Sequence, residues 1–189
     1  MKISYSIMAM PTREHLVKKI QNILGDIPVS YDTGKGIWDN RVKSMLMFDP
    51  NCEFHCVLQD DAIPCEDFYN EVDKIVTEQK AYSLYFGNRK NMQDIGLKAI
   101  ENGGVEMDWL SWGVAIVLPT KIIPSLIKYW EGKRSLLKND DTRIARYLKE
   151  IGMNVYYPIP SLVEHNHLEK SIIDPTGEHK NRKAFKFKG

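Results

Sequence analysis

The pattern of apolar and polar positions changes its period repeatedly along the chain. Short apolar or alternating runs predict strands, whereas apolar residues three or four positions apart predict helices. The predicted strands cover residues 2–9, 27–31, 54–58, 82–86, 112–118 and 155–157. The predicted helices cover residues 12–24, 37–48, 65–79, 121–130 and 140–151. Strands separated by helices predict an α/β fold with a mostly parallel central sheet flanked by helices.

The sequence predicts one domain. A length of 189 residues favours a single core over two, and no internal repeat or low-complexity linker divides the chain. We place the domain at residues 1–178 and a basic, flexible tail at residues 179–189. Between residues 87 and 107 the periodic pattern fades into a polar, glycine-containing stretch, which predicts a long functional loop.

Composition and charge exclude several classes of protein. The 26 Lys and Arg nearly balance the 25 Asp and Glu, which argues against a uniformly basic nucleic-acid coat. A hydrophobic fraction of 43% excludes overall disorder. The longest apolar stretches fall short of the ~20 residues of a membrane-spanning helix. The basic excess lies in the tail, whose five cations are Lys180, Arg182, Lys183, Lys186 and Lys188; without them the chain has a net charge of −4.

The N-terminus and the cysteines indicate a cytoplasmic protein, which we expect to be located in a bacterial host cell. Residues 1–10 read as a strand rather than a signal peptide, because Ser4 and Ser6 alternate with apolar residues. Cys52, Cys56 and Cys65 are an odd number and form no Cys-x-x-Cys pair. They are therefore expected to be reduced thiols.

Two adjacent acids directly follow the strand predicted at 54–58, in the segment Gln59-Asp60-Asp61. Ligands of α/β sheets bind at the carboxyl ends of strands, and hard cations such as Mg²⁺ and Mn²⁺ prefer carboxylate oxygens. This placement makes Asp61 a candidate metal ligand and Asp60 a candidate contact to a sugar or ribose. The alternative is a solvated turn in which an Asp caps the following helix.

A second acidic pair, Asn139-Asp140-Asp141, precedes the last predicted helix. One interpretation is structural: Asn139 or Asp140 caps the helix, and acids in its first turn suit the helix dipole. The other makes Asp140 or Asp141 a general base that removes a proton from an incoming hydroxyl. A third candidate is His165 or His167, since neutral imidazole is a good ligand for Mn²⁺, although an isolated His can also be a surface group.

Together these segments resemble the GT-A fold of nucleotide-sugar glycosyltransferases, over residues 3–172. Gln59-Asp60-Asp61 is similar to the DXD motif of that fold, which implies that Asp61 binds the divalent metal under the donor diphosphate. A Gln stands where a first Asp is usual. Asn139-Asp140-Asp141 resembles the acidic pair that holds the base of inverting members. Pro160-Ser161-Leu162-Val163-Glu164-His165 is similar to the closing segment whose His completes the metal site, which favours His165.

The resemblance also implies donor contacts elsewhere. The end of the first strand, with Met10, Pro11 and Arg13, is where this fold meets the nucleotide, and Asp32 follows the second strand. The segment 34–40 and Arg41 would reach the base or the diphosphate; the alternative for Arg41 is a surface position on a helix. The segment that begins Trp112-Gly113 resembles the lining of the sugar pocket, although a Trp in such a strand also suits a core position.

The expected activity is transfer of a sugar from a UDP-sugar, with UDP-glucose favoured, to an acceptor hydroxyl, with Mn²⁺ or Mg²⁺ and with inversion. The leading acceptor is a hydroxymethylated pyrimidine of phage DNA, because Phe185 and Phe187 alternate with the tail cations as in a strand that tracks phosphates and stacks on bases. Bacterial surface polysaccharide or lipopolysaccharide is the alternative acceptor. The same tail residues also suit a membrane-surface arm or a solubilising end.

Two other classes of protein stay open. A non-catalytic nucleic-acid-binding module would carry Lys and Arg, rather than acids, at the strand ends. A nucleotidyltransferase would also place paired acids around a metal. It would normally have a Gly-rich phosphate loop after the first strand, and Met10-Pro11-Thr12-Arg13 is a poor version of one. The sequence does not indicate an oligomeric state.

Overall fold

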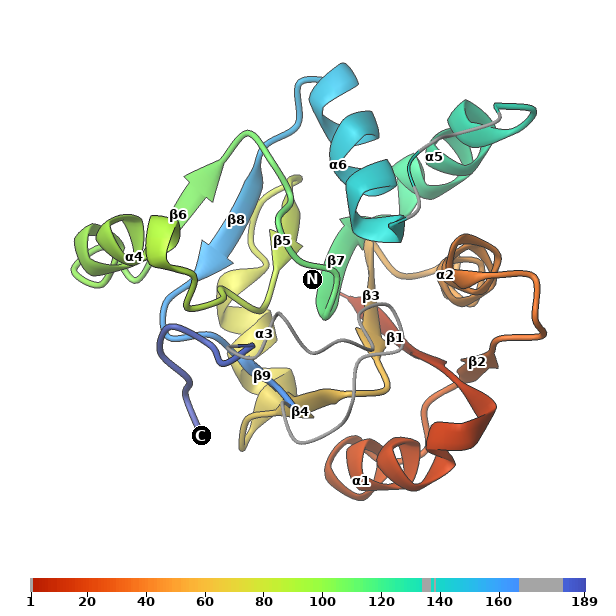
Figure 1. Ribbon diagram of the computed structural model, residues 1–189, viewed down its shortest axis with the longest axis horizontal. Helices are drawn as coiled ribbons and strands as arrows, with labels where there is room; N and C mark the ends of the chain where they lie inside the picture. Colours follow the sequence, from red (N-terminus) through yellow and green to blue (C-terminus); the bar gives the residue numbers. More distant parts are fainter. Residues whose placement is uncertain (1, 134–136, 138, 167–181) are drawn as a thin grey trace.

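The computed structural model describes residues 2–133, 137, 139–166 and 182–189. Within these residues a seven-stranded sheet has the order β2-β1-β3-β7-β5-β8-β6 (Figure 1). Its strands are β1 (Ile3–Ala9), β2 (Val29–Tyr31), β3 (Phe54–Gln59), β5 (Ala81–Ser83), β6 (Gly104–Met107), β7 (Ala115–Pro119) and β8 (Val155–Pro158). Only β7 and β6 run against the other strands. The predicted α/β fold with a mostly parallel sheet is confirmed.

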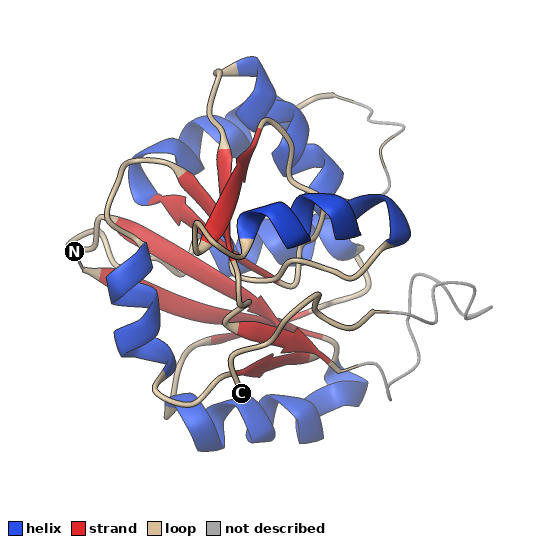
Figure 2. Cartoon of the chain, turned by 90° about the vertical axis from the view of Figure 1, so that its left-hand side faces the viewer, coloured by secondary structure: helices blue, strands red, loops and turns tan. Residues whose placement is uncertain are grey.

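The order in which successive strands join the sheet reverses direction at β1. The chain passes from β1 to β2 through α1 (Glu14–Leu24), and then through α2 (Ile37–Met45) to β3, on the other side of β1. Right-handed crossovers in opposite directions place the two helices on opposite faces of the sheet, and Figure 2 shows the strands between helices on both sides. Such a reversal leaves a crevice at the carboxyl ends of β1 and β3.

The positions of the apolar side chains explain why β3 and α1 form where the sequence predicts them. Phe54 to Leu58 of β3 are all buried, as a strand between two covered faces requires. In α1 the buried residues recur at helical spacing: Leu16, Val17, Ile20 and Leu24. Gly25 ends this helix with a φ of 78°, a left-handed conformation that favours glycine.

Four further helices complete the layers: α3 (Phe68–Ile75), α4 (Gln93–Ala99), α5 (Ile123–Trp130) and α6 (Asp140–Glu150). The prediction of a long loop over residues 87–107 is wrong, because this stretch contains α4 and the strand β6. The helix α4 buries only the small residues Gly96 and Ala99, which leave little apolar periodicity to recognise. None of the described helices is long and apolar enough to cross a membrane.

A second, two-stranded sheet was not predicted. It pairs β4 (Ala62–Pro64) with β9 (Val163–His165), and Ala62 lies opposite His165. The Asn166 amide also donates to the Asp61 carbonyl oxygen over 2.8 Å. Each strand has three residues, too few to show a period of two. This small sheet brings His165 beside Asp61, although the two residues are far apart in sequence.

The described part of the predicted flexible tail, residues 182–189, packs against the body of the protein. Ala184 bridges to Gly87 and Phe187 to Ser161. The Phe185 ring covers Gly96, where an added Cβ would lie 2.8 Å from the ring. The difference from the prediction has a physical cause, since Phe185 and Phe187 bury apolar area on the body while Lys186 between them faces solvent. Residues 179–181 and His167 lie outside the described residues.

A buried histidine links β1, β3 and α2. His55 is 1% exposed; its Nδ1 lies 2.9 Å from Ser4 Oγ and its Nε2 lies 3.0 Å from the carbonyl oxygen of Ser44. Burial lowers the pKa of His55 to about 4, so the folded protein holds the neutral ring.

We expect the free energy of unfolding to fall by about 3 kcal/mol between pH 6.5 and pH 4 through this residue. In that pH window His55 is protonated in the unfolded chain but stays neutral in the folded protein. Urea denaturation at several pH values should show a shallower pH dependence in His55→Gln than in the parent. His15→Gln, which alters an exposed histidine on α1, should keep the parental slope. Equal slopes in His55→Gln and the parent would contradict the assignment.

Candidate functional site

A pocket of about 320 Å³ opens at the carboxyl ends of β1 and β3, where the chain reverses direction. Seven residues predicted from the sequence line it: Met10, Arg13, Asp32, Gln59, Asp60, Asp61 and His165. Six others line it: Met8 and Ala9 at the end of β1, Gly36, Ile37 and Asn40 within the segment 34–40 that was expected to reach the base or the diphosphate, and Arg182 of the basic tail. The sequence assigned Arg182 to the acceptor and not to the donor. The predicted positions of the nucleotide, the acidic segment and the histidine therefore meet in one cavity.

Asp60 ties the end of β1 to the end of β3. Its Oδ2 accepts a hydrogen bond from the Met10 amide over 2.8 Å, and its Oδ1 accepts one from Arg13 Nη1 over 3.0 Å. The residue is 5% exposed, and burial raises the pKa of its carboxyl group. With both oxygens engaged, Asp60 shapes the floor of the pocket.

Asp61 and His165 face one another in the pocket. Asp61 Oδ2 lies 3.4 Å from His165 Nε2 and 3.2 Å from Arg13 Nη1. Asp61 Oδ1 and His165 Nδ1 are buried and have no hydrogen-bond partner among the described residues. Burial lowers the pKa of His165, which favours the neutral ring that ligates metals.

The Asp61–His165 pair fits one side of a divalent metal site. Neighbouring ligand atoms around one octahedral cation lie roughly 3 Å apart, close to the 3.4 Å that separates the facing atoms of this pair. Within the described residues, no three His, Cys, Asp or Glu side chains converge on one point. A cation held here would therefore take its other ligands from substrate and water, as Mg²⁺ commonly does.

Asp32 and Asn40 form the wall on the side of β2 and α2. Asp32 Oδ1 accepts a hydrogen bond from the Gly34 amide over 2.9 Å. Asn40 is held by Ser30 Oγ, which donates to its Oδ1 over 2.6 Å, and its Nδ2 donates to the Ala9 carbonyl oxygen over 3.0 Å. Asn40 lies in the segment 34–40 that was expected to reach the base or the diphosphate, although no periodic signal distinguished it within that segment.

Arg41 lies outside the pocket and is fully buried. Its Nε donates to Asp140 Oδ2 over 2.5 Å, and its Nη2 donates to the Gly113 carbonyl oxygen over 2.9 Å. Both interpretations of Arg41 from the sequence, a donor contact and a surface residue, differ from this position. Asp140 is 2% exposed, so its charge is balanced within the protein and the pair joins α2 to the start of α6.

Asp141 does not line the pocket, but it approaches the same glycine, Gly113, as Gln59 of the lining. A Cβ added to Gly113 would lie 3.3 Å from Asp141 Cβ and 3.5 Å from Nε2 of Gln59, which lines the cavity. Asp141 Oδ1 accepts a hydrogen bond from the Thr142 amide over 2.6 Å. Burial, with the Asp140 charge as a second cause, raises the pKa of Asp141. Of the two acids, Asp141 is the one without an arginine ion pair in the described structure.

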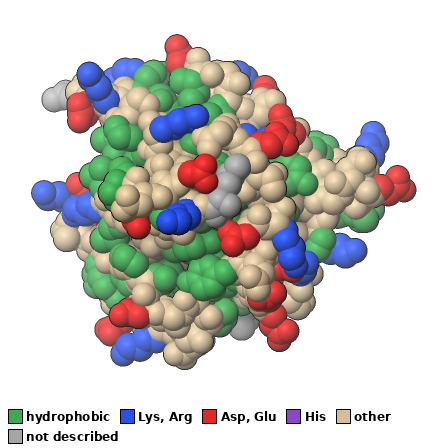
Figure 3. Space-filling view, turned by 180° about the vertical axis from the view of Figure 1, so that it is seen from behind, with side chains coloured by type: hydrophobic (Ala, Val, Ile, Leu, Met, Phe, Trp, Pro, Cys, Tyr) green, Lys and Arg blue, Asp and Glu red, His purple; other side chains and the backbone are tan. Residues whose placement is uncertain are grey.

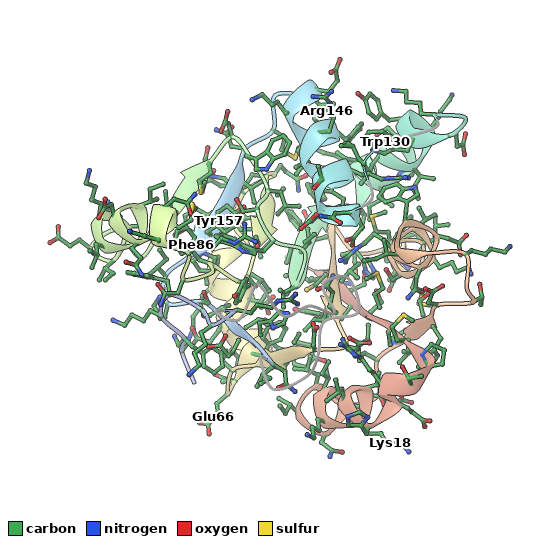
Figure 4. All side chains as sticks on the ribbon, viewed as in Figure 1. Lys18, Glu66, Phe86, Trp130, Arg146 and Tyr157 are labelled. Carbon is green, nitrogen blue, oxygen red and sulfur yellow. The ribbon has the colours of Figure 1, made fainter. Side chains whose placement is uncertain are left out.

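Besides Arg41, three predicted donor contacts do not line the pocket: Pro11, Trp112 and Gly113. Trp112 is 8% exposed and packs edge-on against Phe86 and Tyr157, with ring centroids 5.4 and 6.0 Å away. Figure 4 shows Phe86 and Tyr157 close together inside the protein. The core interpretation of Trp112 fits this packing. Pro11 is exposed and begins a short 3-10 helix, Pro11–Arg13, which turns Arg13 inward.

Comparison with known proteins supports the fold. No family model matches the chain, and no curated protein matches it either. The catalytic domain of Drosophila β1,4-galactosyltransferase 7, in complex with xylobiose, matches with a TM-score of 0.53 and 8% identity over 97% of this chain and 81% of that one. A D211N mutant of that enzyme, in complex with manganese, UDP-Gal and xylobiose, matches with a TM-score of 0.50 and 11% identity over 95% and 74%.

A third structure extends the comparison. The 4-diphosphocytidyl-2C-methyl-D-erythritol synthase of Anaerococcus prevotii matches with a TM-score of 0.50 and 8% identity over 92% of this chain and 95% of that one. At these identities the likeness concerns the fold. The chain has a GT-A-like α/β fold, which it shares with these solved structures.

The Arg41–Asp140 pair allows a matched stability test. Arg41→Met should lower the free energy of unfolding by about 3–5 kcal/mol, because it leaves the Asp140 carboxylate buried without its partner. Lys43→Met on the same helix breaks a partly exposed pair with Asp39 and should cost less than about 0.5 kcal/mol. Urea denaturation measures both. Similar losses of unfolding free energy in the two variants would show that the buried pair contributes no more to stability than the partly exposed pair.

Proposed function

We propose that the protein is a divalent-metal-dependent glycosyltransferase that moves a sugar from a UDP-sugar to an acceptor hydroxyl with inversion. The observation that carries the proposal is the Asp61–His165 pair, which lines the pocket at the reversal point of the sheet with Asp61 Oδ2 3.4 Å from His165 Nε2. The other side-chain atoms of the pair, Asp61 Oδ1 and His165 Nδ1, have no hydrogen-bond partner among the described residues. The neighbouring enzyme in complex with manganese and UDP-Gal supports the same assignment. UDP-glucose is the first donor to test.

The pocket offers a place for each part of the donor. Asp32 and Asn40 present polar groups for the base and ribose on one wall. Asp61 and His165 would hold Mn²⁺ or Mg²⁺ on the other side, and Gln59 lies between this pair and Asp141. A bound divalent cation supplies Lewis-acid stabilisation of the charge that develops on the leaving diphosphate. Asp60 keeps the first and third strands in register around the ligand.

Asp141 is the residue that we assign as the general base. It takes the proton of the acceptor hydroxyl while the oxygen forms its bond to the anomeric carbon, and the bond from that carbon to the diphosphate breaks with UDP as the leaving group. Asp140 is committed to Arg41 and serves to position the helix start. The raised pKa of Asp141 makes it a better proton acceptor than an exposed Asp.

The packing of the C-terminal segment changes which acceptor we propose first. The DNA hypothesis depended on a free basic tail, whereas Phe185 lies over Gly96 and Phe86. In the space-filling view of Figure 3, Lys and Arg are interspersed with Asp and Glu and do not form one basic patch. We therefore propose a saccharide hydroxyl, as in a surface polysaccharide, ahead of a hydroxymethylated pyrimidine in DNA.

The rival functions have weaker support. A nucleotidyltransferase shares the fold, but the segment from Met10 to Arg13 lacks the glycines that let a backbone wrap a triphosphate. A nucleic-acid-binding module would place cations at the strand ends, and here Asp32, Asp60 and Asp61 line the pocket.

Asp61→Asn tests the metal role. The variant should lose roughly 100-fold or more of the Mn²⁺-dependent UDP release from a UDP-sugar, because the neutral amide is a poor ligand for a hard cation. The matched control is Glu66→Gln, an exposed carboxylate that points away from the protein (Figure 4); it should keep the parental rate. Full activity of Asp61→Asn in the presence of EDTA would refute the assignment.

Asp141→Asn tests the base. Transfer should fall by about 10²- to 10⁴-fold while UDP binding stays unchanged. Because the base works deprotonated and its pKa is raised, the parental rate should decline as pH falls, beginning above the ordinary Asp range; the variant should lack this decline. Asp140→Asn should instead lower thermal stability. Parental transfer by Asp141→Asn would exclude it as the base.

A further inference from the structure

The C-terminal segment, residues 182–189, returns to the pocket and places Arg182 in its lining. Figure 1 shows this segment beside β9. Tyr85 Oη donates to the Arg182 carbonyl oxygen over 2.6 Å, and the Ala184 amide donates to Glu164 Oε1 over 2.7 Å. The same Glu164 oxygen accepts from the amide of His165 over 2.7 Å. Arg182 is thus tied to the strand that carries the candidate metal ligand.

The rest of the segment has its own anchors. The Ser161 amide donates to the Lys186 carbonyl oxygen over 2.7 Å, and the Lys188 amide donates to the Ser161 carbonyl oxygen over 3.1 Å. Ser161 is fully buried, and its Oγ accepts from the Phe86 amide over 2.9 Å. Lys188 also pairs with Glu71 of α3. These contacts fix the backbone that presents Arg182.

Of the two arginines that line the pocket, Arg182 is the one available to bind an anionic ligand. Arg13, the other guanidinium in the lining, pairs with both Asp60 and Asp61. In the part of the chain that the structure describes, the Arg182 side chain makes no ion pair with a carboxylate. A guanidinium without a carboxylate partner in a pocket suits phosphate recognition.

We propose that Arg182 binds the diphosphate of the nucleotide-sugar donor and that residues 183–189 anchor it at the donor site. The inference rests on the proposed function and adds to it a residue that positions the leaving group. Lys183, the next residue, is exposed, so the recognition depends on one guanidinium and not on the basic character of the segment.

The test compares UDP with uridine, each titrated into the full chain with Mn²⁺ by isothermal titration calorimetry or NMR. Arg182→Gln should raise the Kd for UDP roughly 10- to 100-fold, the usual range for a lost charge-assisted hydrogen bond, and should leave the Kd for uridine unchanged. Arg182→Lys should recover part of the affinity. The matched control Lys183→Gln should bind both ligands like the parent.

The outcomes separate this inference from the proposed function. If the parent binds UDP and Arg182→Gln binds it equally well, the role of Arg182 is refuted and the proposed function stands. Equal weakening in Arg182→Gln and Lys183→Gln would also refute it, since a diffuse charge effect would explain both. Loss of uridine binding in Arg182→Gln would show a structural role instead. A parent that binds no UDP with Mn²⁺ overturns both proposals.

Discussion

The parallel pairing of β1 with β3 is the constraint on which the site depends. Its register, from Ile3 opposite Phe54 to Met8 opposite Gln59, brings both strands to an end at the same edge of the sheet. The Asp60 amide then donates to the Met8 carbonyl oxygen over 3.0 Å, so the acidic segment begins where β1 turns away. A shift by one residue would turn the side chains of β3 to the opposite face and remove the pocket.

Much of this framework could be predicted, because long apolar runs identify buried strands whatever surrounds them. The sequence also indicated the acids at the end of β3 and the histidine near the end of the chain. It could not show Arg41 in the interior, since the pattern on α2 does not reveal the Asp140 carboxylate opposite it. The strand β9 and the packing of Arg182 depend on contacts between distant segments, which no local pattern encodes.

In each acidic pair we assign different roles to the two carboxylates. The first member, Asp60 or Asp140, is held by an arginine and fixes backbone geometry. The second member, Asp61 or Asp141, is the one to which we assign the cation or the proton in the proposed function. Two neighbouring carboxylates are tolerable in a protein interior because arginine balances their charge: Arg13 pairs with both Asp60 and Asp61, and Arg41 pairs with Asp140. Under the proposed function, each pair would combine a structural and a chemical role.

The short pairing of β4 with β9 joins segments that are separated by more than half of the chain. Contacts at such sequence separation form late in folding, because the entropy of closing the intervening loop opposes them. A molecule bound across Asp61 and His165 would act as a cross-link between these segments and would stabilise the native state as a whole. By mass action, such a ligand would also offset destabilising changes remote from the pocket, because it binds the native state and not the unfolded chain.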